Sequence, residues 1–138
     1  MQTLRNTLLT LLFAMLLVAG CEHADPLDPN RLEPTLSSIQ ANIFNLNCTF
    51  SGCHVGGSPV LPGVMNLRAG QAYANIVNVP SLERANLLRV APGDPENSYL
   101  VMKIEGRAGP RMPLNLPALS AEEIAVIRQW IADGAPDN

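Results

Sequence analysis

Two cysteines and a histidine lie within one short stretch of the chain, Cys48-Thr49-Phe50-Ser51-Gly52-Cys53-His54. Two thiols can add across the two vinyl groups of a porphyrin, and a histidine directly after the second cysteine can then bind the iron axially. The common form of this motif has two residues between the cysteines, whereas four residues separate them here. The stretch predicts covalent haem attachment, with a short disulfide loop as the alternative.

The first 20 residues have the features of an export signal. Arg5 is the only charged residue among them, and the run from Leu8 to Val18 is almost wholly apolar. This run is too short to span a bilayer comfortably. The signal ends in Leu17-Val18-Ala19-Gly20-Cys21, which resembles the lipobox of bacterial lipoproteins. That resemblance implies an acylated Cys21 and a lipid anchor on the periplasmic face of a bacterial membrane. An ordinary signal peptide with an incidental cysteine is the alternative.

Export limits what the remaining thiols can do. Outside the cytoplasm, paired thiols become disulfides unless another group uses them. The chain has three cysteines, and the lipobox accounts for one. Cys48 and Cys53 are therefore expected to form either a disulfide or a haem attachment site. Zinc is a weaker interpretation, because two cysteines and one histidine leave the fourth ligand unidentified.

Composition divides the rest of the chain into a tether and a folded domain. Residues 21–34 contain three prolines and no apolar period, which predicts an extended, flexible tether. His23 lies in this tether, and we expect it to be solvated. Residues 35–138 then form one small domain. The formal net charge is −3 at pH 7, and no basic stripe is present, so nucleic acid is not an expected partner.

Apolar periodicity predicts helices and no convincing strand. The first helix is expected from about Leu36 to Asn47, with Ser37 and Gln40 in capping-box spacing. A short helix is expected from Gln71 to Val77, ended by Pro80. The apolar stripe of the first helix is expected to be Ile39, Ile43 and Leu46.

Two more helices are expected in the second half. Asp94 and Pro95 are suited to begin a helix that continues to Ile104, with Gly106 closing it. In the last helix, Ser120 and Glu123 form a capping box. Its apolar stripe is Ile124, Ile127 and Ile131, and Gly134 and Pro136 stop it. The sequence thus predicts an all-α fold of three to four helices with long loops.

A second axial ligand for iron is expected to be a methionine. Past the tether the chain has no second histidine, and methionine is the known partner of histidine in cytochromes c. Met112 is favoured because Pro110 and Pro113 hold its loop rigid, and a weak thioether ligand benefits from positioning. Met65 is the next candidate, and Met102 is expected to fill the core.

The order of these features resembles the class I cytochrome c family, in particular the small c-type haem domains of bacteria. The resemblance extends over about residues 36 to 136 and includes Pro92-Gly93-Asp94-Pro95-Glu96-Asn97-Ser98-Tyr99-Leu100 and Arg111-Met112-Pro113. It implies one covalent haem c, with Cys48 and Cys53 as attachment points, His54 as the proximal ligand and Met112 as the distal ligand. It also implies an electron carrier rather than an enzyme, alone or as an accessory subunit of an oxidoreductase. Its partners would be redox proteins, with no small-molecule substrate.

Three functions of different classes stay open at this point. The first is one-electron transfer with both axial positions filled. The second is a redox enzyme or gas sensor whose distal ligand is labile or missing; the lack of a distal histidine argues against a peroxidase. The third is a haem-free lipoprotein in which a Cys48–Cys53 disulfide stabilises a binding or structural module.

Several side chains are candidates for contacts with a haem. Arg111, Arg107 and Arg89 could neutralise its propionates, although an exposed surface arginine is the ordinary alternative. Aromatic rings could line the porphyrin or hydrogen-bond a propionate, although core packing is equally expected of them. These aromatic candidates are Tyr73, Tyr99 and Trp130.

Overall fold

The computed structural model describes residues 31–56 and 65–138, and Leu32–Asn138 form one compact unit. The expected export signal, Cys21, His23, most of the tether and the glycine- and proline-rich segment after His54 lie outside the described residues. Within the described ranges every regular element is helical, and the β-type contacts are isolated bridges. The prediction of a helical fold without strands is confirmed for these residues.

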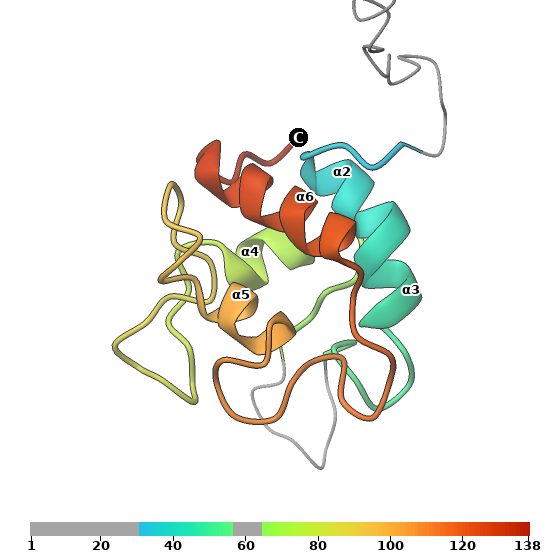
Figure 1. Cartoon of the computed structure of the whole chain (residues 1–138), viewed down its shortest axis with the longest axis horizontal. Coiled ribbons are helices and arrows are strands. Elements are labelled where there is room, and N and C mark those ends of the chain that lie inside the picture. The colour runs from blue at the N-terminus through green and yellow to red at the C-terminus, as the bar shows by residue number, and fades with distance from the viewer. Residues whose placement is uncertain (1–30, 57–64) are drawn as a thin grey trace, which may run out of the picture. The chain divides into compact units, whose positions relative to one another are not determined.

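The first three helical segments are continuous, and long loops connect the later helices (Figure 1). No helix in the described part of the chain is long and apolar enough to cross a membrane. The elements are α2 (Leu36–Ile39), η2 (Gln40–Phe44), α3 (Asn45–Asn47), α4 (Ala72–Ile76), α5 (Tyr99–Ile104) and α6 (Ala121–Ala132).

The first three segments are continuous and together make the helix that was expected from Leu36 to Asn47. Its N-cap is Thr35, whose hydroxyl accepts a hydrogen bond from the amide of Ser38 at 3.2 Å. The capping box predicted at Ser37 and Gln40 is therefore wrong. Gln40 is buried instead, and its side-chain amide donates to the carbonyl of Leu67 at 2.8 Å.

A π-helical turn, η2, interrupts this helix and changes which residues face the core. The amide of Asn45 bonds to the carbonyl of Gln40, five residues earlier, so one extra residue enters the turn and every later side chain is rotated. Ile43 and Phe44 are buried, whereas Leu46 is 61 % exposed. The prediction that Leu46 completes the apolar stripe is wrong for this reason.

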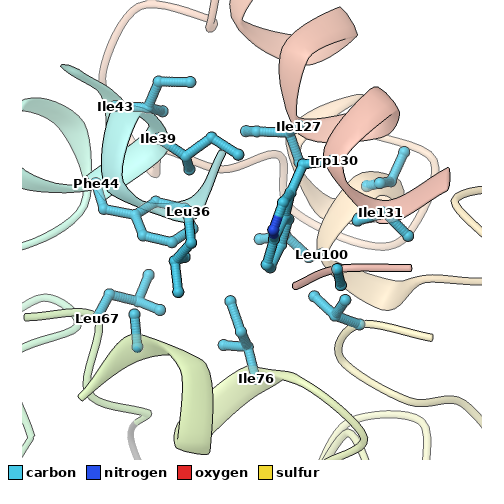
Figure 2. Close-up of a cluster of buried hydrophobic side chains, with 14 of the residues drawn as sticks. Leu36, Ile39, Ile43, Phe44, Leu67, Ile76, Leu100, Ile127, Trp130 and Ile131 are labelled. Atoms are coloured by element: carbon cyan, nitrogen blue, oxygen red, sulfur yellow. The ribbon is translucent and has the colours of Figure 1, made fainter. Parts of the chain in front are cut away.

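The core lies where the last helix packs against the first (Figure 2). Trp130 and Ile127 of α6 meet Leu36 and Ile39 of α2 in one cluster of buried side chains. The indole nitrogen of Trp130 donates to the carbonyl of Pro136 at 2.9 Å, so its one polar atom is satisfied. Burial of this large ring joins α2 and α6 within that cluster.

The end signals of α6 are confirmed. The hydroxyl of Ser120 accepts from the amide of Glu123, and the carboxylate of Glu123 accepts from the amide of Ser120. The helix ends at Ala132, and Gly134 follows with a φ of 96°. Ile127 and Ile131 are fully buried and Ile124 is partly buried against the same core cluster.

The helix expected from Asp94 begins later. α5 starts at Tyr99 with Ser98 as its N-cap, and Asp94 instead accepts from the amide of Asn97 at 3.1 Å, forming a local turn. The buried hydroxyl of Ser98 donates to the carbonyl of Asp94 and accepts from the amide of Ala91. These bonds hold residues 94–97 as a turn. Gly106 follows the C-cap of α5 with a φ of 73°, in agreement with the prediction that it closes the helix.

Candidate cofactor site

The backbone of His54 is held on both sides. Its amide donates to the carbonyl of Cys48 at 3.0 Å, and its carbonyl accepts from the amide of Leu67 at 2.8 Å. Cys48 is the C-cap of α3, and the side chain of Leu67 belongs to the core cluster (Figure 2). The histidine is therefore fixed between the end of the first helix and a buried residue.

A tight turn accommodates the four residues between the cysteines. The amide of Cys53 donates to the carbonyl of Phe50 at 2.9 Å, and Gly52 has a φ of 82°, which favours glycine. Gly56 lies so close to Asn66 that a Cβ atom there would stand 3.1 Å from the amide nitrogen of that side chain. The spacer thus forms a turn that returns the chain to the core at His54.

The two thiols lie at the edge of the core in different environments. Cys48 is partly buried against the core cluster, Cys53 is exposed, and both are free. Burial raises the pKa of the Cys48 thiol to about 12, and the negative charges of a Cys53 thiolate and of Glu123 add to this shift. Cys48 therefore keeps its proton at neutral pH, which makes it a poor thiolate nucleophile.

The imidazole of His54 has a buried nitrogen without a partner. Its Nδ1 atom is buried and makes no hydrogen bond. Burial lowers the pKa of His54, and the positive charges of Arg89 and Lys103 lower it further. The ring is thus neutral near neutral pH, the form that binds metals. A buried polar atom left unsatisfied costs about 1–3 kcal/mol, so this ring is expected to have a binding partner.

Three sulfur-bearing side chains pack against the same core cluster, namely Cys48, Met65 and Met112. The amide of Met112 is bonded to the carbonyl of Lys103 at 2.9 Å, so α5 holds the loop that carries this methionine. Met102 is partly buried but does not belong to the set that packs on the cluster. The structure therefore brings the two favoured methionines and Cys48 to one core, and leaves Met102 apart from it.

A buried lysine was missed by the sequence reasoning. Lys103 is 7 % exposed, and its Nζ atom lies 3.4 Å from the carboxylate of Glu83. The hydroxyl of Tyr99 donates to the same carboxylate at 2.8 Å. Chiefly because of this hydrogen bond, the pKa of Glu83 lies below its ordinary value. The sequence signal that could have indicated this burial is that Lys103 is the only charged residue within the apolar run of α5.

The aromatic candidates are engaged elsewhere. Trp130 is fully buried in the core and bonded to Pro136, and the hydroxyl of Tyr99 is bonded to Glu83. Tyr73 is partly buried against the core cluster and borders an open surface hollow of about 530 Å³. That hollow lies between the first helix, α4 and the last residues of the chain, and none of the cysteines, His54 or Met112 lines it.

A bare metal site has no support in the described residues. No group of three or more histidine, cysteine, aspartate and glutamate side chains there is arranged to hold an ion.

Comparison of the chain with protein-family models, with curated proteins and with solved structures finds no match. The function has to be inferred from the chain's own residues.

Proposed function

We propose that this protein is a membrane-tethered periplasmic c-type cytochrome with a cytochrome c-like domain around one haem. Cys48 and Cys53 hold the haem through thioether bonds, His54 is its proximal ligand and Met112 its distal ligand. The protein transfers single electrons between redox partner proteins and acts on no substrate of its own. A lipid on Cys21 and the proline-containing tether keep the domain at the membrane.

The observation that carries the proposal is the buried, unpartnered nitrogen of a neutral His54 beside two free thiols. Hydrogen bonds fix the histidine backbone to Cys48 and Leu67, so the fold itself holds the segment that carries the ring. A neutral imidazole is the form that could bind iron through one ring nitrogen while the other nitrogen donates a hydrogen bond. A histidine that served only the core would be expected to have its buried nitrogen hydrogen-bonded.

The state of the thiols suits attachment. Each thiol adds across one vinyl group, so that an S–C bond and a C–H bond form while the S–H bond and the vinyl π bond are lost. This addition transfers no electrons and needs reduced cysteines, which a disulfide cannot supply.

The remaining residues hold the site and exclude water. Bound haem iron supplies a one-electron couple between its ferrous and ferric states. Met112 offers a thioether from a loop that the carbonyl of Lys103 anchors, and its contact with the core cluster keeps that side chain partly dry. With His54 and Met112 both bound to the iron, no position on it would be open to a substrate, which favours electron transfer over catalysis.

An absorption spectrum of the full chain, exported to the periplasm, tests the proposal. We expect sharp bands in the dithionite-reduced protein and colour that stays with the polypeptide after acid-acetone extraction. The matched control is a double variant, Cys48→Ala with Cys53→Ala, which should yield no covalently held haem.

The opposite result is equally clear. A colourless protein without free thiols at Cys48 and Cys53, made in a host that attaches haem to a four-residue spacer, would overturn the proposal. It would establish the disulfide-stabilised lipoprotein instead.

A further inference from the structure

Arg111 has a buried guanidinium nitrogen with no acceptor. Its Nη1 atom is buried and unbonded, while its Nη2 atom donates to the carbonyl of Leu116 at 3.2 Å. The side-chain carbons pack on Gly106, where a Cβ atom would stand 3.4 Å from the Cβ of Arg111. The head group is therefore held in place on one side and lacks an acceptor on the other.

The other two arginine candidates and Lys103 already have partners. Arg107 is bonded to Glu105 at 2.5 Å, and Lys103 to Glu83. Arg89 donates from Nη1 to the carbonyl of Asn75 at 2.7 Å. Arg111 is set apart from them by its unbonded buried nitrogen.

The guanidinium of Arg111 is suited to bind an anion. A guanidinium cannot lose its proton in a protein, and a buried donor nitrogen is costly unless it finds an acceptor. One main-chain carbonyl leaves the positive charge uncompensated. The planar fork of Arg111 matches the two oxygens of a carboxylate.

We propose that Arg111 binds a propionate carboxylate of the haem. This assignment rests on the proposed function, since a propionate is the anion that a haem held at Cys48 and Cys53 would bring. Arg111 directly precedes Met112, so the loop that supplies the distal ligand also supplies the counter-charge. Of the three arginines that the sequence offers, the structure favours this one because its nitrogen is buried and unsatisfied.

The test compares Arg111→Gln with Arg107→Gln in the haem-loaded full chain. Both changes remove one positive charge, but Arg107 lies on the surface among carboxylates. Loss of the positive charge leaves the propionate uncompensated and favours ferric iron. We expect the ratio of reduced to oxidised protein at a fixed redox poise to fall about tenfold in R111Q, which is 59 mV for a one-electron couple. R107Q should change the ratio less than twofold, because solvent and salt screen an exposed charge.

Arg111→Lys separates charge from shape. It keeps a positive charge at the same place and should lower the ratio less than threefold. Equal potentials in R111Q and R107Q, in protein that carries haem, would overturn the assignment and leave the proposed function intact. A colourless unsubstituted protein would overturn both.

If R111Q does not fold, nitrogen NMR of the unsubstituted, arginine-labelled, haem-loaded protein tests the same assignment. A carboxylate-bound guanidinium rotates slowly and gives separate Nη signals, which R111K identifies by their disappearance. A single averaged Nη signal for Arg111 would contradict the assignment.

Discussion

The amide of Met112 donates a hydrogen bond of 2.9 Å to the carbonyl of Lys103, at the end of α5. The side chain of the same lysine is buried and paired with Glu83. The loop that carries Met112 is thus tied to a helix, and that helix is tied to the loop that carries Glu83. A weak thioether ligand benefits from this support, because little ordering is left for the binding step.

Met112→Ala should abolish the sulfur-to-iron charge-transfer band of the oxidised protein. The alanine offers no thioether, so the band disappears if Met112 is the distal ligand. Met102→Ala is the matched control, since Met102 lies on α5 apart from the side chains packed on the core, and it should leave the band intact. Survival of the band in M112A would move the assignment to Met65.

Cys48→Ser and Cys53→Ser should each leave haem attached through one thioether. The free vinyl group stays in conjugation with the ring, so the reduced, denatured haem should absorb at longer wavelength than in the unsubstituted protein. Absorption in alkaline pyridine measures this shift. An unchanged spectrum in either variant would show that the substituted cysteine carries no thioether.

Trp130→Ala should destabilise the fold by about 3–5 kcal/mol, the usual cost of removing a buried large aromatic side chain. The ring is fully buried and its nitrogen is bonded to Pro136, so the variant loses packing and a hydrogen bond. Urea unfolding measures the difference. Leu82→Ala is the control, since Leu82 is 73 % exposed, and it should change stability by less than about 0.5 kcal/mol.

Asn138→Ala should lower stability by about 1 kcal/mol. The side-chain oxygen of Asn138 accepts from the amide of Leu36 at 2.9 Å, and its carbonyl oxygen accepts from the amide of Ser37 at 2.8 Å. Both amides belong to the first turn of α2, beside which the chain ends (Figure 1). Asn138→Asp keeps the acceptor and should restore stability in the same unfolding experiment. If N138A and N138D are equally unstable, the side-chain oxygen does not act as a cap.

Glu83→Gln should destabilise the protein at neutral pH and have no effect in acid. The hydrogen bond from Tyr99 is the main cause of the lowered pKa of Glu83, and the charge of Lys103 adds to it. A carboxyl whose pKa is lower in the folded state contributes stability above its unfolded value near 4.5, and that stability is lost as the pH falls through the folded pKa.

The measurement is urea unfolding of the unsubstituted protein and E83Q at neutral pH and again well below the ordinary pKa of glutamate. The difference should vanish in acid. Because Glu83 is largely exposed, the difference at neutral pH should be small. A difference that persists in acid would mean that the carboxylate charge is not its source.

Helix ends could be predicted from the sequence where residues close in the chain determine them. The bounds of the first helix and the capping box of α6 could be predicted because periodicity and capping act within one or two turns. The start of α5 could not, because Asp94 and Ser98 are both suitable caps. Contacts of Ser98 with Ala91 decide between them. The π-helical turn also had no local signal, since Gln40 reaches across to Leu67.

Some features of the candidate site could likewise be predicted from the sequence, and others could not. The cysteines and His54 are adjacent in sequence, so their chemistry could be inferred from the chain. The burial of Lys103 depends on Glu83 and Tyr99, and the unsatisfied nitrogen of Arg111 depends on how its loop folds over Gly106. These are tertiary properties, which periodicity and motif spacing do not contain.

The π-helical turn also sets the angular position of the attachment motif. Each residue advances an α-helix by about 100°, and η2 holds one residue more than a regular turn would. Deleting Ala41 or Asn42, both exposed, would let the helix become regular while Cys48 turned by roughly that angle about its axis. The extra residue in η2 therefore sets the direction of the Cys48 side chain about the helix axis. It turns the first thiol toward the core, and the loop after Cys48 keeps its length.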